Sequence, residues 1–288
     1  MTLVYIGSSA FALAVMDAAG LEPELVITRP PAPRGRGRRV EPTPLAAAAR
    51  ERGITVREPE RLEELAGELD ALAPELLCLC AYGALVREPL LSGYEILNVH
   101  PSLLPRWRGA APIERAIMAG DERTGVSLMR LVAELDAGPV CASGSLAITP
   151  DDDAGTLAGR LAELAGALLR AALPGPRRYA EQDGAFATYA EKITAADRIL
   201  DPTRPAAALE RTVRALRPQI GARLSDGLGV IRAALAPAPA PELAPGELRA
   251  QGGRLWFGAS PGALELEVVQ PPGKRPMDAA AYLRGHAR

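Results

Sequence analysis

Short apolar runs alternate with stretches of helical period through the first 173 residues of the chain. The apolar runs predict strands at 3–6, 25–28, 54–57, 76–81, 96–99, 126–132 and 139–148. The amphipathic stretches predict helices at 11–19, 44–52, 61–73, 113–120 and 156–173. The run at 76–81 is apolar at every position, which is typical of a central parallel strand buried on both faces. This alternation predicts the α/β class and a doubly wound, Rossmann-like domain over residues 1–173.

The pattern changes after residue 173. The sequence Pro174-Gly175-Pro176 ends the long helix, and the mixed segment at 174–197 is predicted to be a linker. One further helix is expected at 206–216. Short alternating runs then predict strands at 221–224, 228–234, 246–250, 254–258 and 264–270. Five short strands with glycine and proline turns predict a small OB-like β-barrel, so we expect a second domain over residues 198–288.

Composition narrows the class of protein. The 288 residues are enough for two domains, and 48% of them are apolar, which indicates a globular chain. The net charge of −2 excludes a uniformly basic nucleic-acid binder. No apolar run approaches the roughly 20 residues that span a bilayer, so we expect no membrane partner. Three cysteines are too few for a disulfide scaffold and are typical of a reducing cytosol, which predicts a cytoplasmic protein.

The charge is unevenly distributed along the chain. Residues from 198 onward carry 13 basic and 8 acidic side chains, a net of +5, which leaves −7 on the preceding residues. A basic cluster nevertheless lies in the acidic part, with arginines at Arg29, Arg34, Arg36, Arg38 and Arg39. Prolines and glycines interleave these arginines, so we expect an exposed cationic loop with neither a helix nor a central strand.

The densest group of polar side chains directly follows an apolar strand. Asn98 and His100 are two residues apart, so on an extended segment both face the same side. Residues at the carboxyl end of a parallel strand face the ligand crevice of such a sheet. Asparagine supplies an amide donor, and histidine titrates near neutral pH. A lone histidine after a strand is more often structural, and the Asn-x-His pair leaves a structural and a catalytic role open.

Asp136 lies between two predicted strands, in the sequence Glu134-Leu135-Asp136-Ala137-Gly138. It is either a turn residue followed by a glycine, or a carboxylate that reaches the same crevice from a neighbouring strand and orients His100. Sequence spacing alone does not bring the two side chains together.

Other motifs do not favour a different chemistry. The turn Gly7-Ser8-Ser9-Ala10 lacks the G-x-G-x-x-G pattern, which argues against NAD. Cys78 and Cys80 alternate along a buried strand without a second pair, so we expect no metal site there. Ser102 does not lie in a G-x-S-x-G elbow. The aspartates at 151–153 precede a helix that they are expected to cap.

Residues 98–112, NVHPSLLPRWRGAAP, closely resemble the signature of the 10-formyltetrahydrofolate-dependent formyltransferases. The extension at 106–113, RWRGAAPI, is similar to the members of that family that act on methionyl-tRNA. Further matches in order and spacing lie at 34–39, 42–44, 81–83, 135–138 and 273–277. The resemblance covers nearly the whole chain, and its departures from the family pattern lie at 7–11 and 217–222.

The resemblance implies formyl transfer from 10-formyltetrahydrofolate to the α-amino group of methionine on initiator methionyl-tRNA, without a metal ion. Asn98 and protonated His100 are expected to stabilise the oxyanion, and Asp136 to hold His100 and assist proton transfer. The residues expected to bind folate are Ala81, Tyr82, Gly83, Leu85, Ser102, Leu103, Leu104, Pro105, Leu135 and Gly138. The residues expected to contact tRNA phosphates are Arg34, Arg36, Arg38 and Arg39, together with the basic second domain.

Two other functions stay open. Relatives that formylate an amino sugar nucleotide or a free folate-linked substrate share the asparagine, histidine and aspartate, but generally lack the RWRGAAPI extension and the basic loop. A non-catalytic RNA-binding protein with a degenerate pocket is a different class, and the intact Asn98, His100 and Asp136 weigh against it. An assay with 10-formyltetrahydrofolate and charged initiator tRNA distinguishes the three functions.

Overall fold

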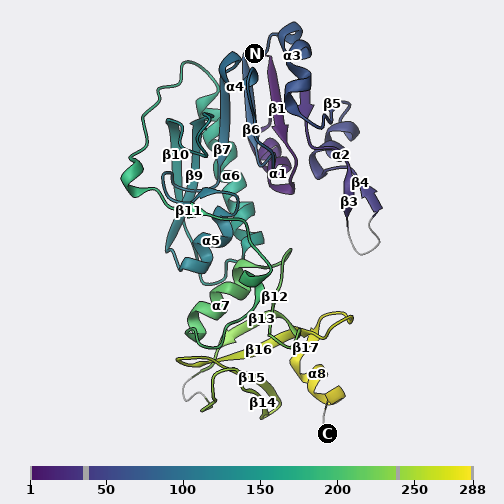
Figure 1. The fold of residues 1–288 in the computed structure, drawn as a ribbon, viewed down its shortest axis with the longest axis vertical. Helices are drawn as coiled ribbons and strands as arrows, with labels where there is room; N and C mark the ends of the chain where they lie inside the picture. The colour runs from purple at the N-terminus through teal and green to yellow at the C-terminus, as the bar shows by residue number, and fades with distance from the viewer. Residues whose placement is uncertain (1, 35–38, 238–240, 287–288) are drawn as a thin grey trace. The chain divides into compact units, whose positions relative to one another are not determined.

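A computed structural model describes residues 2–34, 39–237 and 241–286 of the chain, and its elements are labelled in Figure 1. The chain divides into two compact units. The first comprises Met1–Pro112, Arg123–Ala147 and Ala158–Ala190. The second comprises Ile113–Glu122, Ile148–Leu157 and Glu191–Arg288. The second unit therefore includes two short segments from the part of the sequence that we assigned to the first domain.

The first unit is built on a seven-stranded sheet with the order β10-β9-β7-β6-β1-β2-β5. Its strands are β1 (Leu3–Gly7), β2 (Leu25–Ile27), β5 (Thr55–Arg57), β6 (Leu76–Cys80), β7 (Ile96–His100), β9 (Arg123–Arg130) and β10 (Val140–Ala147). The strands from β7 to β5 in this order are parallel, whereas β9 runs antiparallel to both of its neighbours, β7 and β10. The Rossmann-like prediction is confirmed, with an antiparallel pair of strands, β9 and β10, added at one edge.

Helices cover both faces of this sheet. They are α1 (Ala10–Ala19), α2 (Pro44–Glu51), α3 (Ala66–Leu72), α4 (Leu90–Gly93), most of α6 (Ala154–Ala172) and the 3-10 turn η1 (Leu62–Leu65). A second 3-10 turn of this unit, η2 (Gly184–Phe186), has no buried residue. Successive residues of β1 point to opposite faces. Tyr5 donates a hydrogen bond to the Ala12 carbonyl of α1 at 2.7 Å, whereas Val4 and Ile6 pack in one core cluster with Leu69 of α3. All of β6 is buried, as its apolar run predicts.

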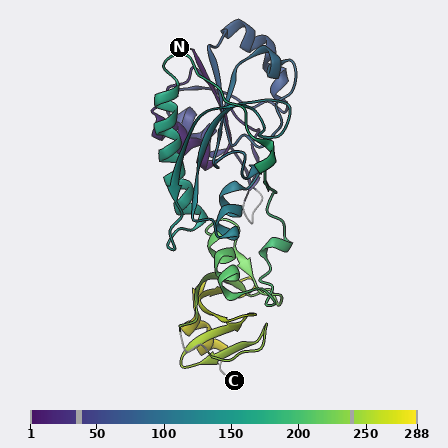
Figure 2. The same cartoon turned by 90° about the vertical axis from the view of Figure 1, so that its left-hand side faces the viewer.

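The long helix α6 lies beside α1 on one face of the sheet (Figure 2). The two helices approach closely at Gly166, where a Cβ atom would lie 2.5 Å from the Ala18 carbonyl carbon. At the start of α6, Asp153 Oδ1 accepts a hydrogen bond from the Thr156 amide at 2.9 Å. The predicted capping role of the aspartates before this helix is confirmed for Asp153.

The basic segment contains a small hairpin that the sequence did not predict. β3 (Ala32–Arg34) and β4 (Arg39–Glu41) pair in an antiparallel manner, outside the seven-stranded sheet. The two strands are not part of a central sheet, as expected. Both are edge strands, and an edge strand tolerates a proline such as Pro33. Residues 35–38, with Arg36 and Arg38, lie outside the described residues. The Arg39 side chain is exposed.

The segment expected to be a linker is instead divided between the units. Its residues up to Ala190 belong to the first unit. Ala180 exchanges two backbone hydrogen bonds with Val140, at 2.8 and 2.9 Å. β11 (Tyr189–Ala190) pairs in parallel with β8 (Arg108–Gly109). Proline and glycine at 174–176 therefore break the helix without freeing the chain that follows up to Ala190.

The second unit contains one antiparallel sheet. Its strands are β12 (Ala222–Arg223), β13 (Gly229–Leu235), β14 (Leu248–Gln251), β15 (Arg254–Gly258), β16 (Ala263–Gln270) and β17 (Met277–Asp278), in the order β12-β13-β16-β15-β14 with β17 on β16. Its helices are most of α5 (Pro112–Ala119), η3 (Ala196–Arg198), α7 (Ala206–Ala215) and α8 (Ala279–His286). Leu209 and Val213 of α7 are buried in one cluster with Leu264 and Leu266 of β16. The predicted strand-rich domain is confirmed, whereas β17 and α8 were not predicted.

Candidate active site

Strand β7 presents two polar side chains at its carboxyl end. Asn98 and His100 are both buried, although they are polar. Because alternate residues of a strand point to the same face, the two side chains lie next to each other, as the sequence predicts. β7 pairs with β6 on one side and with β9 on the other, so the pair lies at the centre of the sheet.

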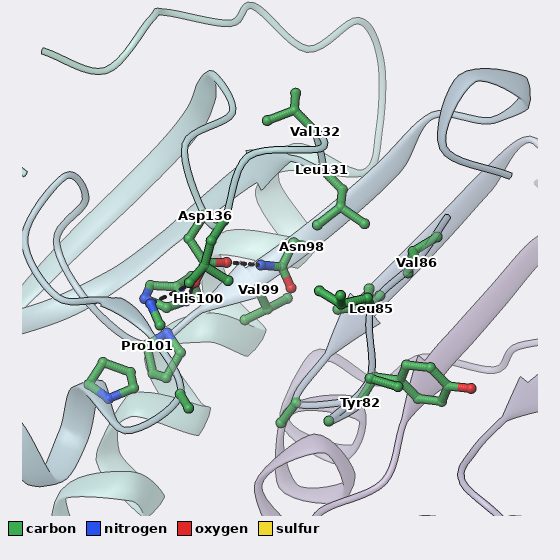
Figure 3. Close-up of a pocket in the computed structure, with 18 of the residues that line it drawn as sticks. Tyr82, Leu85, Val86, Asn98, Val99, His100, Pro101, Leu131, Val132 and Asp136 are labelled. Atoms are coloured by element: carbon green, nitrogen blue, oxygen red, sulfur yellow. Dashed lines mark hydrogen bonds and ion pairs between the residues drawn. The ribbon is translucent and has the colours of Figure 1, made fainter. Parts of the chain in front are cut away.

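Asp136 reaches these two side chains from the loop between β9 and β10. Its Oδ1 accepts a long hydrogen bond from Asn98 Nδ2 at 3.5 Å, and its Oδ2 lies 3.6 Å from His100 Nδ1 (Figure 3). Its backbone has φ +47°, in the left-handed region that aspartate tolerates better than most residues. The structure thus brings together the three residues that sequence reasoning singled out as catalytic candidates.

Backbone groups of β8 and the residue before it orient this cluster. His100 Nε2 lies 2.8 Å from the Trp107 carbonyl oxygen, and the Gly109 amide donates to Asp136 Oδ2 at 2.8 Å. A carbonyl oxygen only accepts, so His100 Nε2 carries a hydrogen. Nδ1 is therefore the ring nitrogen that is left to exchange a proton with Asp136.

A cavity of about 380 Å³ opens beside the Asn98–His100–Asp136 cluster. This size falls within the range of small-molecule pockets. Apolar side chains form the wall opposite the cluster, among them Leu85, Val86, Leu131 and Val132 (Figure 3). Leu85 is 69% exposed, and Leu135 is 52% exposed. Two exposed leucines that line one cavity indicate a site that an apolar ligand covers.

Half of the predicted folate residues line this cavity. They are Ala81, Tyr82, Gly83, Leu85 and Leu135. The Tyr82 ring is buried, and its hydroxyl points away from the Asn98–His100–Asp136 cluster (Figure 3). Burial raises the pKa of Tyr82, so its hydroxyl stays neutral at physiological pH.

The other five predicted folate residues do not line the cavity. Leu103, Leu104 and Pro105 line a different cavity, bounded by β10. Ser102 is fully buried and donates a hydrogen bond from its hydroxyl to the Arg106 carbonyl at 2.6 Å. Gly138 packs so tightly on β9 that a Cβ atom would collide with the Arg130 carbonyl. These residues follow the site in the sequence, but the chain turns away from it after Pro101.

Sequence reasoning missed much of the cavity wall. The missed residues are Leu79, Val86, Val99, Pro101, Gly109, Ala110, Pro112, Leu131, Val132 and Ala133. The apolar stretch at 131–133, immediately before the Glu134–Gly138 turn, was a signal that could have located the far wall. Gly109 gave no such signal, because its contribution is a backbone amide.

The thiols of β6 are unsuited to nucleophilic or metal chemistry. Both are fully buried, and burial raises the pKa of Cys80 to about 12 and that of Cys78 further. Within the described ranges, no group of three or more histidine, cysteine, aspartate or glutamate side chains could hold a metal ion. Across the same ranges, no helix has the length and apolar character needed to cross a membrane.

Family models match both units of the chain. The formyl transferase model matches residues 5–173, and the model of the formyl transferase C-terminal domain matches residues 192–287. The chain therefore belongs to the formyl transferase family, in agreement with the resemblance drawn from its motifs.

Within this family, the chain is similar to methionyl-tRNA formyltransferases over almost its whole length. It is 45% identical to the methionyl-tRNA formyltransferase of Halorhodospira halophila, over 98% of this chain and 96% of the relative. It is 42% identical to that of Methylococcus capsulatus, over 100% of this chain and 97% of the relative.

Solved structures share the fold at low sequence identity. The sugar 3N-formyl transferase WlaRD superposes with a TM-score of 0.68 at 14% identity, covering 96% of this chain and 99% of that one. HypX from Aquifex aeolicus, solved in complex with tetrahydrofolic acid, has a TM-score of 0.64 at 16% identity, covering 98% of this chain and 47% of that one. These likenesses establish the two-unit fold only.

Proposed function

We propose that this formyl transferase moves a formyl group from 10-formyltetrahydrofolate to the α-amino group of methionine on initiator tRNA. Similarity to methionyl-tRNA formyltransferases over 96–97% of their length supports the tRNA substrate. The observation that carries the proposal is the convergence of Asn98, His100 and Asp136 at one end of an apolar cavity. Three free cysteines support a cytoplasmic location.

The cavity supports a folate donor. Folate contributes a flat, largely apolar ring system with a polar edge, and pockets for such ligands have apolar walls with a few polar groups. Leu85, Val86, Leu131 and Val132 supply apolar walls, and residues 81–84 line the cavity beside them. The catalytic cluster lies at the end of these walls, where the formyl group must be presented.

Two N–H donors then face the reacting carbonyl. The bound folate supplies the formyl carbon, which the neutral amine of methionine attacks, and negative charge develops on the formyl oxygen. Asn98 donates from Nδ2, and protonated His100 donates from Nδ1, since its Nε2 is engaged by the Trp107 carbonyl. Donors that are fixed before the reaction stabilise this charge without reorganising.

Asp136 completes the proton transfer. One carbon–nitrogen bond forms to the amine and one breaks to the folate nitrogen, so one proton must leave the first nitrogen and one must reach the second. The Asp136 carboxylate accepts the proton of the amine, and His100 Nδ1 gives its proton to the folate nitrogen as the second bond breaks. The proton on Asp136 then passes to the adjacent His100 Nδ1 and restores both groups. The Gly109 amide holds the carboxylate in this place.

The first experiment measures formyl-methionyl-tRNA after incubation with 10-formyltetrahydrofolate and charged initiator tRNA. The wild-type protein should form it, and His100→Ala should reduce turnover by about 100-fold or more, because a donor and a proton carrier are both lost. Tetrahydrofolate affinity should change little. A wild-type protein that formylates only an amino sugar nucleotide would contradict the proposed substrate.

The basic segment supports the tRNA partner. Arginines at 34–39 and the net charge of +5 from residue 198 onward supply sequence-independent attraction for phosphates. Replacing Arg36, Arg38 and Arg39 with alanine should weaken tRNA binding and reduce the slope of log affinity against log salt by about two to three. Arg178→Ala, at an exposed position elsewhere, is the control. Equal slopes for the triple variant and the wild type would remove the segment from the tRNA site.

A further inference from the structure

A buried arginine links the signature motif to the segment that resembled a linker. Arg108 is 4% exposed, and its Nε and Nη2 atoms donate to Gln182 Oε1 at 3.1 and 2.9 Å. Gln182 lies two residues after Ala180, whose backbone is paired with β10. Arg108 therefore holds the glutamine side chain, and the backbone two residues before it is fixed to the sheet.

The same glutamine binds the loop that carries Asp136. Gln182 Nε2 donates to the Asp136 carbonyl at 2.8 Å and to the Gly138 carbonyl at 2.7 Å. The orientation of the amide is unambiguous, since Arg108 can only donate and the two carbonyls can only accept. All the hydrogen-bonding capacity of the NH₂ group is used on this loop.

Arg108 and Gln182 thus bind three alternate residues of the loop that carries Asp136. Arg108 Nη1 donates to Glu134 Oε1 at 3.3 Å, and Gln182 takes the carbonyls of Asp136 and Gly138. The loop needs this support because Asp136 has a left-handed backbone. Such a conformation costs a non-glycine residue free energy and persists only where surrounding contacts impose it.

We propose that Gln182, anchored by Arg108, is a positioning residue for Asp136. It fixes the backbone of residues 134–138, and so fixes the point at which the Asp136 carboxylate meets His100 and Asn98. The role goes beyond the proposed reaction but rests on it for its kinetic consequence. The second arginine of the RWRGAAPI motif then acts inside the protein, as an anchor for the catalytic loop, and not as a contact for tRNA.

The Gln182→Glu substitution separates positioning from folding. A glutamate keeps the size of the side chain and offers Arg108 an acceptor of opposite charge. It removes both donors and places a carboxylate oxygen against two carbonyl oxygens. Gln182→Ala removes the contacts on both sides, and Glu181→Gln, at the exposed neighbouring position, is the control.

Three quantities are measured for each variant: kcat under saturating substrates, the Kd for tetrahydrofolate and the Tm. We expect Gln182→Glu to lower kcat at least about tenfold, with less than about a threefold change in folate Kd and a Tm close to that of the wild type. Glu181→Gln should match the wild type in all three. A wild-type kcat in Gln182→Glu would overturn the proposal. Turnover would then depend only on the acceptor for Arg108, and not on the two hydrogen bonds that Gln182 donates to the loop. Equal losses in kcat and folate affinity would also overturn it.

A crystal structure of Gln182→Glu gives a readout that is independent of turnover. We expect the Asp136 carboxylate to leave the Gly109 amide, and an unchanged contact would overturn the proposal even if the variant were slow. A wild-type protein without formylation activity would refute the proposed function instead. In that case the displacement of Asp136 still decides whether Gln182 positions it.

Discussion

The Asp136→Asn substitution tests whether the site needs a carboxylate or only a polar side chain. In the structure both carboxylate oxygens accept: Oδ1 from Asn98 Nδ2 at 3.5 Å, and Oδ2 from the Gly109 amide at 2.8 Å. Asparagine offers one acceptor and one NH₂ group. If the new NH₂ group takes the place of Oδ2, it opposes the Gly109 N–H. If it takes the place of Oδ1, it opposes the NH₂ group of Asn98, which must turn away. Each arrangement removes a hydrogen bond and leaves His100 without a charged partner.

The expected size of the effect follows from the role of a proton acceptor. General acid–base groups contribute about 10²–10⁴-fold to the rate, and each factor of ten corresponds to about 1.4 kcal/mol. We therefore expect Asp136→Asn to lower kcat by at least about 100-fold, or about 2.7 kcal/mol of transition-state stabilisation. The Tm should stay near that of the wild type, because the substitution preserves the shape of the side chain and no longer buries a charge.

A single-turnover assay isolates this step from product release. Enzyme in excess over charged initiator tRNA, with saturating 10-formyltetrahydrofolate, is sampled for formyl-methionyl-tRNA, and tetrahydrofolate binding is measured in parallel. Asp151→Asn makes the same chemical change at an exposed position and serves as the control. A rate within about threefold of the wild type would refute the proton-transfer role of Asp136.

Two further predictions concern stability. Gly166→Ala places a Cβ atom 2.5 Å from the Ala18 backbone and should lower the free energy of unfolding by about 1–3 kcal/mol. Gly159→Ala, on the same helix with open space around it, should raise the free energy of unfolding by about 0.5–1 kcal/mol. Denaturant melts in which both variants lose the same free energy of unfolding would contradict the close approach of the two helices. The hydrogen-bonded Arg177 guanidinium lowers the pKa of Glu95 from 4.5 to about 2, so Glu95 stabilises the fold above pH 4.5 and this contribution is lost as the pH falls toward 2. In calorimetry, the Tm of Glu95→Gln should therefore fall less than that of the wild type between pH 4.5 and pH 2. Parallel curves of Tm against pH for the two proteins would count against the ion pair.

The hydrophobic pattern by itself determined the central sheet of the first unit. A run that is apolar at every position, such as Leu76–Cys80, is stable only when both faces are covered, and β6 lies in the middle of the sheet. Helix starts also depend on local chemistry. Ser9 and Thr43 cap α1 and α2 by accepting hydrogen bonds from amides three residues further on. These features depend on a few neighbouring residues, which is why one sequence suffices to predict them.

The motif identified Asn98 and His100 but not the groups that orient them. The two side chains share a strand, and a period of two places them on one face. Their orienting partners include the Trp107 carbonyl and the Gly109 amide. Every residue has such backbone groups, so their contribution leaves no pattern in the sequence.

Only the tertiary structure decided which distant residues meet at the site. Asp136 is 38 residues from Asn98 and 46 from Gln182, yet it contacts both. The segment around Gln182 resembled a linker because it lacks periodicity, but its hydrogen bonds go to β8 and β10. A local pattern encodes which face of an element is buried, whereas the packing of the layers decides which residue lies opposite it. For this protein the sequence therefore determined the central strands and the motif, and the packing determined which residues meet at the candidate site.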